Sequence, residues 1–395
     1  MAAREVLEGI YSVGVVDWNT RNFHGHTYTT KRGTTYNAYL IIDDKITLVD
    51  TVLGAFSNEL IANIREVIPI EKIDYIIANH VETDHSGALP ELIKLCPKAK
   101  IFGTQKCKEG LEKNYYLNLD FNIVKTNDKL NLGKKNLIFI EAPMIHWPDS
   151  MFTYCPEEQL LMPNDAFGQH YATSERFDDE VSDCELMDEA AKYFGNILWP
   201  LSSIIINKIV EIKNLNIPIK MIAPSHGIIW RKDPMKIINS YINWAKNTTS
   251  RKVVVIYETM WGATEKMARK IVESLANAGL TTKLFDIAIS DRTEVIKEML
   301  DARGFIFGSS THDNDMLSNI AGFMEFLKGL KPKNRIASCF GSYGWAGGAV
   351  SSLEKIIKEA GIEILQPSLA IKYMPDKDEI NRCYEFGKEF AKKII

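Results

Sequence analysis

The stretch from Asn79 to Gly87, N-H-V-E-T-D-H-S-G, places two histidines and two carboxylates within six residues. A solvated turn needs acidic side chains but gains little from imidazoles, and a helix would scatter the four groups around its surface. In an extended segment, every second side chain points to the same side. His80, Glu82 and Asp84 would then point one way, and His85 would join them if the chain turns directly after it. We therefore predict a metal site here, with ligands for more than one ion.

Three further candidate ligands follow predicted strands, in the kind of loop where a rigid scaffold presents functional groups. They are His146, Asp165 and His226. Each alone would pass for a structural residue, because an acid at a strand end usually forms a turn. Together with the first cluster they give the order H-x-E-x-D-H, then H, D and H. These seven residues predict a metal site in which one carboxylate, Asp165, is available as a bridge.

The residues that must hold this site form a mixed α/β pattern. Two β-rich runs, 36–42 and 46–50, flank the turn Asp43-Asp44 and predict a hairpin. An amphipathic helix near 58–67 precedes an apolar strand at 73–78, which leads directly into the first cluster. Further elements are expected as strands at 100–102, 122–125, 137–141, 160–163 and 219–223, and as helices at 188–195 and 204–213.

The chain turns polar around 247–251, and we place a domain boundary there, between a first domain at 1–249 and a second at 250–395. Beyond the boundary, five strand–helix units alternate regularly, which predicts a doubly wound parallel sheet. Its strands are expected at 252–257, 282–286, 304–308, 335–341 and near 365, and its helices from 264, near 294, from 320, from 346 and at the C-terminus.

The loop 258–264, E-T-M-W-G-A-T, follows a buried strand and opens a helix. Two threonine hydroxyls flank a small-residue turn whose backbone N–H groups, at a helix N-terminus, suit a phosphate. The loop lacks the G-K-[ST] ending of a nucleoside triphosphate site and carries no cation, so neutral donors must hold the phosphate. This is how a flavodoxin holds the phosphate of FMN. The predicted FMN contacts in this loop are Thr259, Met260, Trp261, Gly262, Ala263 and Thr264.

Two more loops, 308–314 and 340–348, lie at the carboxyl ends of strands, where a doubly wound sheet binds its ligand. The loop 340–348 offers Tyr343 and Trp345 for stacking on a flat ring, with glycines that let the backbone approach it. A response-regulator domain without a cofactor would need an acidic cluster after its first strand, and Glu258 alone does not supply one. The predicted FMN contacts here are Ser309, Ser310, Thr311, His312, Asp313, Asn314, Ser342, Tyr343, Gly344, Trp345, Ala346 and Gly347.

The metal cluster resembles the first motif of the metallo-β-lactamase fold, H-x-H-x-D-H, except that Glu82 stands where that fold has a second histidine. A carboxylate in place of an imidazole adds negative charge and a hard oxygen ligand, which favours iron over zinc. Over essentially its whole length, the chain is similar to the flavodiiron proteins, also called A-type flavoproteins. The resemblance implies a metallo-β-lactamase-like αββα domain followed by a flavodoxin-like domain that binds FMN.

Residue by residue, the resemblance implies two iron ions per chain. His24, in the stretch F-H-G-H, would line the pocket beside them. The implied ligands are His80, Glu82 and His146 for one iron, Asp84, His85 and His226 for the other, and Asp165 as the bridge.

The number of electrons that the two cofactors can hold limits the reactions that they could catalyse together. Reducing dioxygen to water takes four electrons, and two ferrous ions plus one reduced FMN hold four; reducing two nitric oxide molecules to nitrous oxide takes two. We therefore expect a water-forming oxidase that is also suited to nitric oxide. A binuclear zinc hydrolase fused to flavodoxin and an electron-carrier flavoprotein with an inert first domain are the alternatives.

The resemblance also implies partners. The chain looks most similar to methanogen enzymes that oxidise a reduced 8-hydroxy-5-deazaflavin coenzyme, and a separate rubredoxin is the alternative electron donor. A head-to-tail homodimer is implied, either alone or as a dimer of dimers, so that the FMN of one protomer meets the iron site of the other; closed two-fold symmetry is common among homo-oligomers.

Composition excludes several other classes. The 395 residues carry 47 basic and 51 acidic side chains, a net charge of −4 without long runs of one sign, so no nucleic-acid partner is expected. No apolar stretch is long enough to cross a bilayer, and no signal-type segment follows Met1. The six cysteines form no C-x-x-C pair. We expect a cytoplasmic protein with free thiols.

Overall fold

The computed structural model describes residues 2–394 and separates into two compact units. The first comprises Met1–Tyr193 and Ser203–Ile242, and the second comprises Phe194–Ser202 and Asn243–Ile395. The short segment 194–202 thus belongs with the second unit although it precedes it in the chain. The domain limits 1–249 and 250–395 stay a prediction from the sequence. No helix among residues 2–394 is long and apolar enough to cross a membrane.

Two sheets form the first unit. One has seven strands in the order β1-β2-β7-β8-β9-β10-β11, and the other has five in the order β12-β13-β14-β15-β16. The strands of the first are β1 (Arg4–Leu7), β2 (Ile10–Ser12), β7 (Tyr39–Ile41), β8 (Thr47–Val49), β9 (Tyr75–Ile77), β10 (Lys100–Gly103) and β11 (Phe121–Ile123). Those of the second are β12 (Lys129–Asn131), β13 (Asn136–Glu141), β14 (Met151–Cys155), β15 (Leu160–Met162) and β16 (Met221–Ile222). The predicted hairpin is confirmed, since β7 and β8 pair antiparallel.

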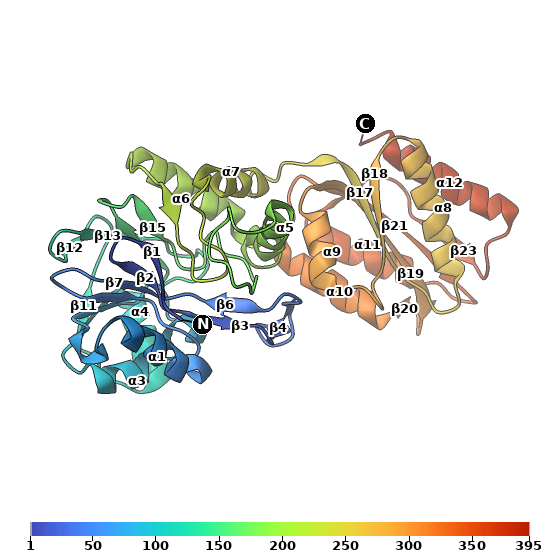
Figure 1. Ribbon diagram of the computed structural model, residues 1–395. Coiled ribbons are helices and arrows are strands. Elements are labelled where there is room, and N and C mark those ends of the chain that lie inside the picture. Colours follow the sequence, from blue (N-terminus) through green and yellow to red (C-terminus); the bar gives the residue numbers. More distant parts are fainter. Residues whose placement is uncertain (1, 395) are drawn as a thin grey trace. The chain divides into compact units, whose positions relative to one another are not determined.

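Apolar side chains fill the spaces between these layers. Ile41 and Ile77 of the first sheet meet Phe139 and Met151 of the second in one core cluster. The opposite face of the first sheet packs in another cluster against α1, α3 and α4, which lie below the strands in Figure 1. The helices of this unit are α1 (Ser57–Val67), α2 (Thr83–Ser86), α3 (Leu89–Leu95), α4 (Gln105–Tyr115), α5 (Asp183–Tyr193), α6 (Ser202–Asn214) and α7 (Pro234–Ala245). This is the predicted αββα arrangement.

A small β-hairpin stands apart from the two sheets. Its strands β4 (Asn22–Phe23) and β5 (Tyr28–Thr29) pair antiparallel, and it is flanked by the paired strands β3 (Val15–Asp17) and β6 (Thr34–Tyr36). Its tip carries His24 and Gly25, both with positive φ. The hairpin therefore presents a histidine on a tight turn rather than on a sheet face.

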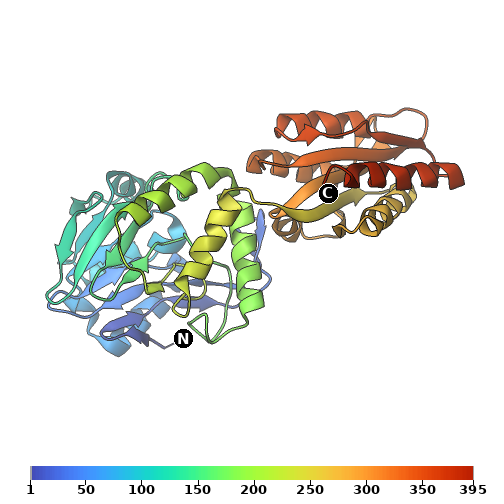
Figure 2. The ribbon, with the colours of Figure 1, turned by 90° about the horizontal axis from the view of Figure 1, so that it is seen from above.

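The second unit is a mainly parallel sheet with helices on both faces (Figures 1 and 2); only the short strand β20 pairs antiparallel, with β19. Its strand order, β18-β17-β19-β21 and then β22 and β23, is the flavodoxin-like order 2-1-3-4-5. The strands are β17 (Ser250–Glu258), β18 (Thr281–Asp286), β19 (Ala302–His312), β20 (Asp315–Met316), β21 (Ile336–Tyr343), β22 (Glu363–Ile364) and β23 (Leu369–Lys372). The helices are α8 (Ala263–Asn277), α9 (Arg292–Met299), α10 (Ser318–Leu330), α11 (Ala349–Glu359) and α12 (Lys377–Ala391).

Most predicted elements appear within a few residues of their expected limits, but two expectations are wrong. The strand expected near 365 is two short strands, β22 and β23, and the last helix starts only after the second of them. The segment expected to be extended through Asp84 instead turns into the helix α2 at Thr83. Ser86 stabilises that turn, because its hydroxyl donates to the carbonyl oxygens of Val81 and Glu82, at 2.8 and 2.9 Å.

Candidate metal centre and flavin pocket

The seven predicted metal ligands come together in the first unit. They lie in loops or short turns that follow strands: His80 and Glu82 after β9, His146 after β13, Asp165 after β15 and His226 after β16, with Asp84 and His85 in α2. Segments far apart in the sequence meet here because parallel and antiparallel strands of two packed sheets end at the same edge. The ligand atoms form two groups, each within 4.8 Å: His80, Glu82, His146 and Asp165, and Asp84, His85 and His226.

Asp165 lies between the two groups. Its Oδ2 is 3.6 Å from the Nε2 of His80 and 3.4 Å from the Nε2 of His146. Its Oδ1 is 3.0 Å from the Nε2 of His85 and 3.5 Å from the Nε2 of His226. One oxygen therefore faces each group, which is the geometry that a bridging carboxylate requires.

Each group also has a carboxylate of its own. Glu82 Oε2 lies 3.3 Å from His80 Nε2 and 3.4 Å from His146 Nε2. In the second group, Asp84 Oδ2 lies 3.1 Å from the Nε2 atoms of both His85 and His226. Each group thus offers two imidazole nitrogens and one carboxylate.

Unpartnered polar atoms show that these residues suit metal ions. Both carboxylate oxygens of Asp84, both ring nitrogens of His85 and the Oδ2 of Asp165 are buried without a hydrogen-bond partner in the described part of the chain. Buried polar groups without partners are costly and rare. Lone pairs that face one another across about 3 to 4 Å without hydrogen-bond geometry are satisfied together when a cation lies between them. Mixed imidazole and carboxylate ligands of this kind suit iron.

Without metal, the carboxylates and the protonated histidines of the two groups stabilise one another's charges. Burial opposes ionisation of Asp165, but the charges of His85 and His146 close to its two oxygens outweigh it and hold the Asp165 pKa well below its usual value. Burial likewise disfavours the protonated form of His80, but hydrogen bonds to Asp149 and Glu82 raise its pKa to about 10. The nearby carboxylates of Asp165 and Glu82 outweigh burial at His146 and raise its pKa to about 9.

Iron uptake by metal-free protein is therefore expected to release protons. Below their raised pKa values, about 10 for His80 and about 9 for His146, both rings are protonated, and a metal binds only the neutral ring. At pH 7 the uptake of iron should release about two protons from these rings, and the affinity should rise about tenfold per pH unit for each proton released. An indicator dye in weak buffer measures the release under anaerobic addition of ferrous salt. Release that is absent at pH 7 would contradict the expectation.

An aromatic and histidine layer adjoins the second group. Phe23 of the β4–β5 hairpin stacks on His170, with ring centroids 4.3 Å apart, and meets the His226 ring edge-on at 5.5 Å. His24 follows it, and its Nε2 lies 3.2 Å from Oε1 of Glu82 while 31% of its side chain remains exposed. The structure thus places His24 beside Glu82, one of the predicted metal ligands. Tyr193 lies within this layer too, 5.2 Å from His170 between ring centroids.

One residue beside the ligands was missed in the sequence. Asp149 is buried, and its Oδ2 accepts hydrogen bonds from the ring of His80 at Nδ1 (3.0 Å) and from the backbone N–H of Val81 (2.7 Å). The stretch H-W-P-D places it three residues after His146, where an acid is more commonly a turn former. Its position so close to a candidate ligand was the only sequence signal available.

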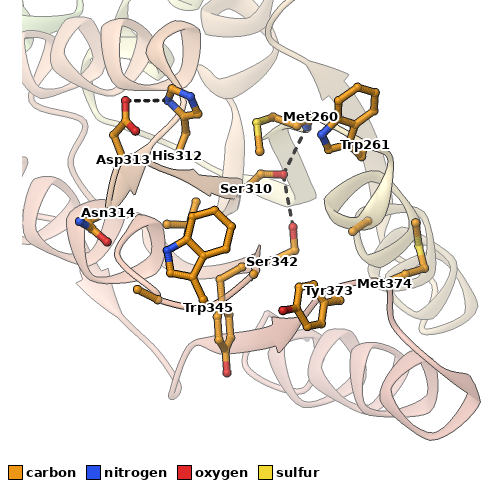
Figure 3. A pocket seen from close by; sticks show the side chains of 15 residues that line it. Met260, Trp261, Ser310, His312, Asp313, Asn314, Ser342, Trp345, Tyr373 and Met374 are labelled. Atoms are coloured by element: carbon orange, nitrogen blue, oxygen red, sulfur yellow. Dashed lines mark hydrogen bonds and ion pairs between the residues drawn. The ribbon is translucent and has the colours of Figure 1, made fainter.

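The loops predicted to hold FMN enclose a cavity of about 660 Å³ in the second unit (Figure 3). Its volume lies within the usual range of cofactor sites. Trp345 and Tyr343 line it, as predicted for residues that stack on a flat ring, and Trp345 is 90% exposed. The predicted contacts in its lining are Met260, Trp261, Ala263, Ser310, Thr311, His312, Asp313, Asn314, Ser342, Tyr343, Gly344, Trp345 and Ala346.

Three hydroxyls from three loops meet beside this cavity: those of Ser310 and Ser342 in its lining, and that of Thr264 behind them. Thr264 Oγ1 lies 2.9 Å from Ser310 Oγ and 2.8 Å from Ser342 Oγ, and Figure 3 shows the two serines at the centre. Thr264 lies in the first turn of α8, where the helix dipole favours an anion. These neutral donors suit a phosphate group. The remaining predicted contacts lie outside the cavity lining: Thr259, Gly262, Thr264, Ser309 and Gly347.

Two lining residues were not predicted. Tyr373 and Met374 follow β23 and are exposed at the cavity (Figure 3). The rule that ligands bind at the carboxyl ends of strands applies to the fifth strand as well. It could have found them if that strand had been expected at 369–372 rather than near 365.

Comparison with known proteins agrees with both units. Residues 34–227 match the ODP family beta lactamase, and residues 255–387 match Flavodoxin. A nitric oxide reductase of Moorella thermoacetica is 52% identical over 392 residues, which cover 98% of each chain. The solved rubredoxin oxygen:oxidoreductase of Desulfovibrio gigas superimposes with a TM-score of 0.97 at 36% identity, over 99% of this chain and 98% of that chain. The flavodiiron protein of Giardia intestinalis does so with a TM-score of 0.96 at 34% identity, over 100% and 97%.

These relatives share the order of domains and nearly the full length of the chain. The predicted fold is confirmed, whereas the similarity to methanogen enzymes stays a prediction. An oxidoreductase that uses nitric oxide or dioxygen is what such relatives have in common. The chain belongs to the flavodiiron proteins, whose cofactors are FMN in the flavodoxin domain and a diiron site in the β-lactamase-like domain.

Proposed function

We propose that this protein reduces nitric oxide to nitrous oxide. The observation that carries the proposal is the pair of ligand groups sharing Asp165, in a chain 52% identical to a nitric oxide reductase. The balanced reaction joins two nitric oxide molecules, two electrons and two protons into nitrous oxide and water. Dioxygen is the second candidate substrate, because a relative of 36% identity is a rubredoxin oxygen:oxidoreductase.

The first unit would hold the diiron site. His80, Glu82 and His146 would ligate one iron, and the other ligand group, with Asp165 as the bridge, would complete the second. When bound, two iron ions supply open coordination positions for the gas and electrons for its reduction. With one oxygen facing each ligand group, Asp165 would fix the separation of the two groups and so of any ions that they hold.

The surrounding residues would manage water and protons. Phe23 covers the rings of His170 and His226, which limits the access of water to the second group. His24 reaches from a partly exposed position to Glu82, at 3.2 Å between Nε2 and Oε1. A proton taken up from solvent at His24 Nε2 can therefore be passed toward the site where the oxygen of nitric oxide becomes water.

The cavity of the second unit would hold FMN, with its phosphate near Thr264 and its ring between Trp345 and the loop of Met260. This assignment is supported by the cavity volume, the hydroxyl cluster and the match to Flavodoxin. FMN would return electrons to the metal site. A head-to-tail homodimer, with the possibility of two such dimers associating, is the assembly that we propose for this transfer, because it brings the flavin of one protomer to the metal site of its partner.

A separate rubredoxin is the electron donor that we propose. It is favoured over the reduced deazaflavin coenzyme because rubredoxin appears in the name of the Desulfovibrio gigas relative. The deazaflavin coenzyme, which the sequence resemblance favoured, remains the second candidate donor.

The test uses the full chain loaded with iron and FMN under anaerobic conditions. Reduced rubredoxin, or the reduced deazaflavin coenzyme, is mixed with nitric oxide or dioxygen, and gas uptake is followed with an electrode. Consumption of two nitric oxide molecules per nitrous oxide with rubredoxin is the expected result. Faster uptake of dioxygen than of nitric oxide would reverse the substrate order, and turnover with deazaflavin alone would reverse the donor. Uptake of neither gas by protein holding two iron ions and one FMN would overturn the proposal.

A further inference from the structure

The two ligand groups match in the residues that would touch the metals. Each holds two histidines, one carboxylate of its own and one oxygen of Asp165. Their formal charges are therefore equal. Any built-in difference between the two iron ions must come from the residues behind these ligands.

Behind His80 lies a buried carboxylate. Oδ2 of Asp149 accepts both the His80 Nδ1 bond at 3.0 Å and the Val81 N–H bond at 2.7 Å. Its Oδ1 is buried and has no hydrogen-bond partner in the part of the chain that the structure describes. The hydroxyl of Thr104 donates to the backbone oxygen of Asp149 at 2.9 Å and fixes the position of the residue. Asp149 thus ties the loop that carries His146 to the loop that carries His80.

Behind the second group the partner is neutral. The Nδ1 of His226 lies 2.6 Å from the backbone carbonyl oxygen of Thr35. The Nδ1 of His85 is buried without a hydrogen-bond partner among the described residues. A carboxylate behind a ligating histidine makes the ring a stronger electron donor than a carbonyl does, because the ring N–H is polarised toward a full charge.

Two other charged groups lie near and do not cancel this difference. Asp50 bonds to Asn79 and Asn164 rather than to a ligand ring. Burial raises the Asp50 pKa, although the charge of His85 opposes the rise. His24, when protonated beside Glu82, acts in the opposite sense to Asp149, but its partly exposed position lets solvent screen it.

We infer that Asp149 is a positioning residue that makes the iron bound by His80 the harder of the two to reduce. Negative charge passed through His80 favours the ferric over the ferrous ion at that position. From the diferric state, the first electron then reduces the iron of the Asp84, His85 and His226 group, and the second electron reduces the iron of the His80 group. The inference rests on the ligand sets proposed above, and it adds an order of reduction to them.

The experiment is an anaerobic titration of ⁵⁷Fe-loaded protein with dithionite and mediators, in the absence of gas. Mössbauer spectra count ferric and ferrous ions, and electron paramagnetic resonance detects the mixed-valent form. The unchanged protein should show two one-electron steps. In Asp149→Asn an oxygen remains to accept both hydrogen bonds and only the charge is lost. The lower-potential step should then move upward, by about tenfold in the ferrous to ferric ratio at fixed potential, or ~59 mV for one electron.

In Asp149→Asn, the higher-potential step, which reduces the iron of the Asp84, His85 and His226 group, should keep its potential. The two potentials then approach each other, so the mixed-valent signal should weaken. Thr104→Val is the matched control, because it removes the backbone contact to Asp149, together with the cap on the Cys107 N–H, but keeps the charge of Asp149; both steps should remain. Asp149→Ala is the second variant, and it should shift the lower step in the same direction and lower the iron content toward one ion per chain. Movement of the upper step, movement of neither, or a single two-electron step in the unchanged protein would overturn the inference.

These outcomes separate the inference from the proposed function. Ordered reduction of two irons in protein that reduces no gas would support the inference and overturn the function. Gas reduction by protein whose two irons are reduced together would support the proposed function and overturn the inference. Protein that takes up no iron would overturn both.

Discussion

Replacing Asp165 by alanine is expected to lower the rate of gas reduction by more than about 100-fold, since even residues behind metal ligands cost 10- to 100-fold when removed. Asp165 is the one carboxylate whose two oxygens face different ligand groups, with Oδ1 3.0 Å from His85 and Oδ2 3.4 Å from His146. Without it, each group keeps only two histidines and one carboxylate, and nothing fixes the separation of the two ions. Iron content should fall below two ions per chain.

The measurement combines iron and FMN analysis with the gas electrode. FMN content, and the rate at which rubredoxin reduces the flavin, should stay unchanged, because the cavity belongs to the other compact unit. Asp165→Asn should retain part of the iron, because its amide oxygen can still face one group. Asp120→Ala, at an exposed position, is the control for the loss of an acid. Full gas reduction by Asp165→Ala protein would show that the bridge is not needed.

Replacing Thr264 by valine is expected to weaken FMN binding by about 10- to 100-fold. The threonine hydroxyl joins Ser310 and Ser342 at 2.9 and 2.8 Å, in the first turn of α8. Thr264 lies behind the cavity lining, so its loss should act through the hydroxyls of Ser310 and Ser342, which it orients toward the phosphate. Losing one hydrogen bond to a charged group costs about 1.5–3 kcal/mol, which corresponds to that range of dissociation constants. Valine has nearly the same shape, so the loss should come from the missing hydroxyl.

Quenching of FMN fluorescence on titration into flavin-free protein measures the affinity. Thr281→Val, an exposed threonine on β18, is the matched control and should bind FMN as before. Gas reduction by the Thr264→Val protein should fall at low FMN concentration and recover when FMN is added in excess. Unchanged affinity would place the phosphate elsewhere in the cavity, and a loss that excess FMN does not restore would indicate damage to the domain.

The candidate ligands were predictable because residue type and spacing are local properties. His80, Glu82, Asp84 and His85 occur within six residues, and no common structural role calls for that combination. Their division into two groups was not predictable from the same stretch. Strand alternation would have placed His80, Glu82 and Asp84 on one side, whereas the turn of α2 at Thr83 sends Asp84 to the other group.

For the flavin site, too, some features could be predicted from the sequence and others could not. Three loops follow strands whose apolar runs are easily recognised, so their residues were expected at one edge of the sheet. Tyr373 and Met374 were missed because the fifth strand is short and half exposed, and its sequence carries little β signal. The hydrogen bonds of Thr264 to Ser310 and Ser342 join residues 46 and 78 positions apart, which no local pattern encodes.

The sequence by itself predicted a mixed α/β first domain, a doubly wound second domain, the types of the candidate ligands and the candidate phosphate loop, because each depends on the period of apolar residues or on short spacings; the αββα arrangement followed from the family resemblance. The resemblance to the flavodiiron proteins implied the division of the ligands and the bridging role of Asp165, but only the tertiary structure shows that one oxygen of Asp165 faces each group and that Asp149 rather than a carbonyl lies behind His80. These features depend on distances between loops that lie far apart in the chain. Such distances are set by how two sheets pack, and packing is a property of the whole core rather than of any segment.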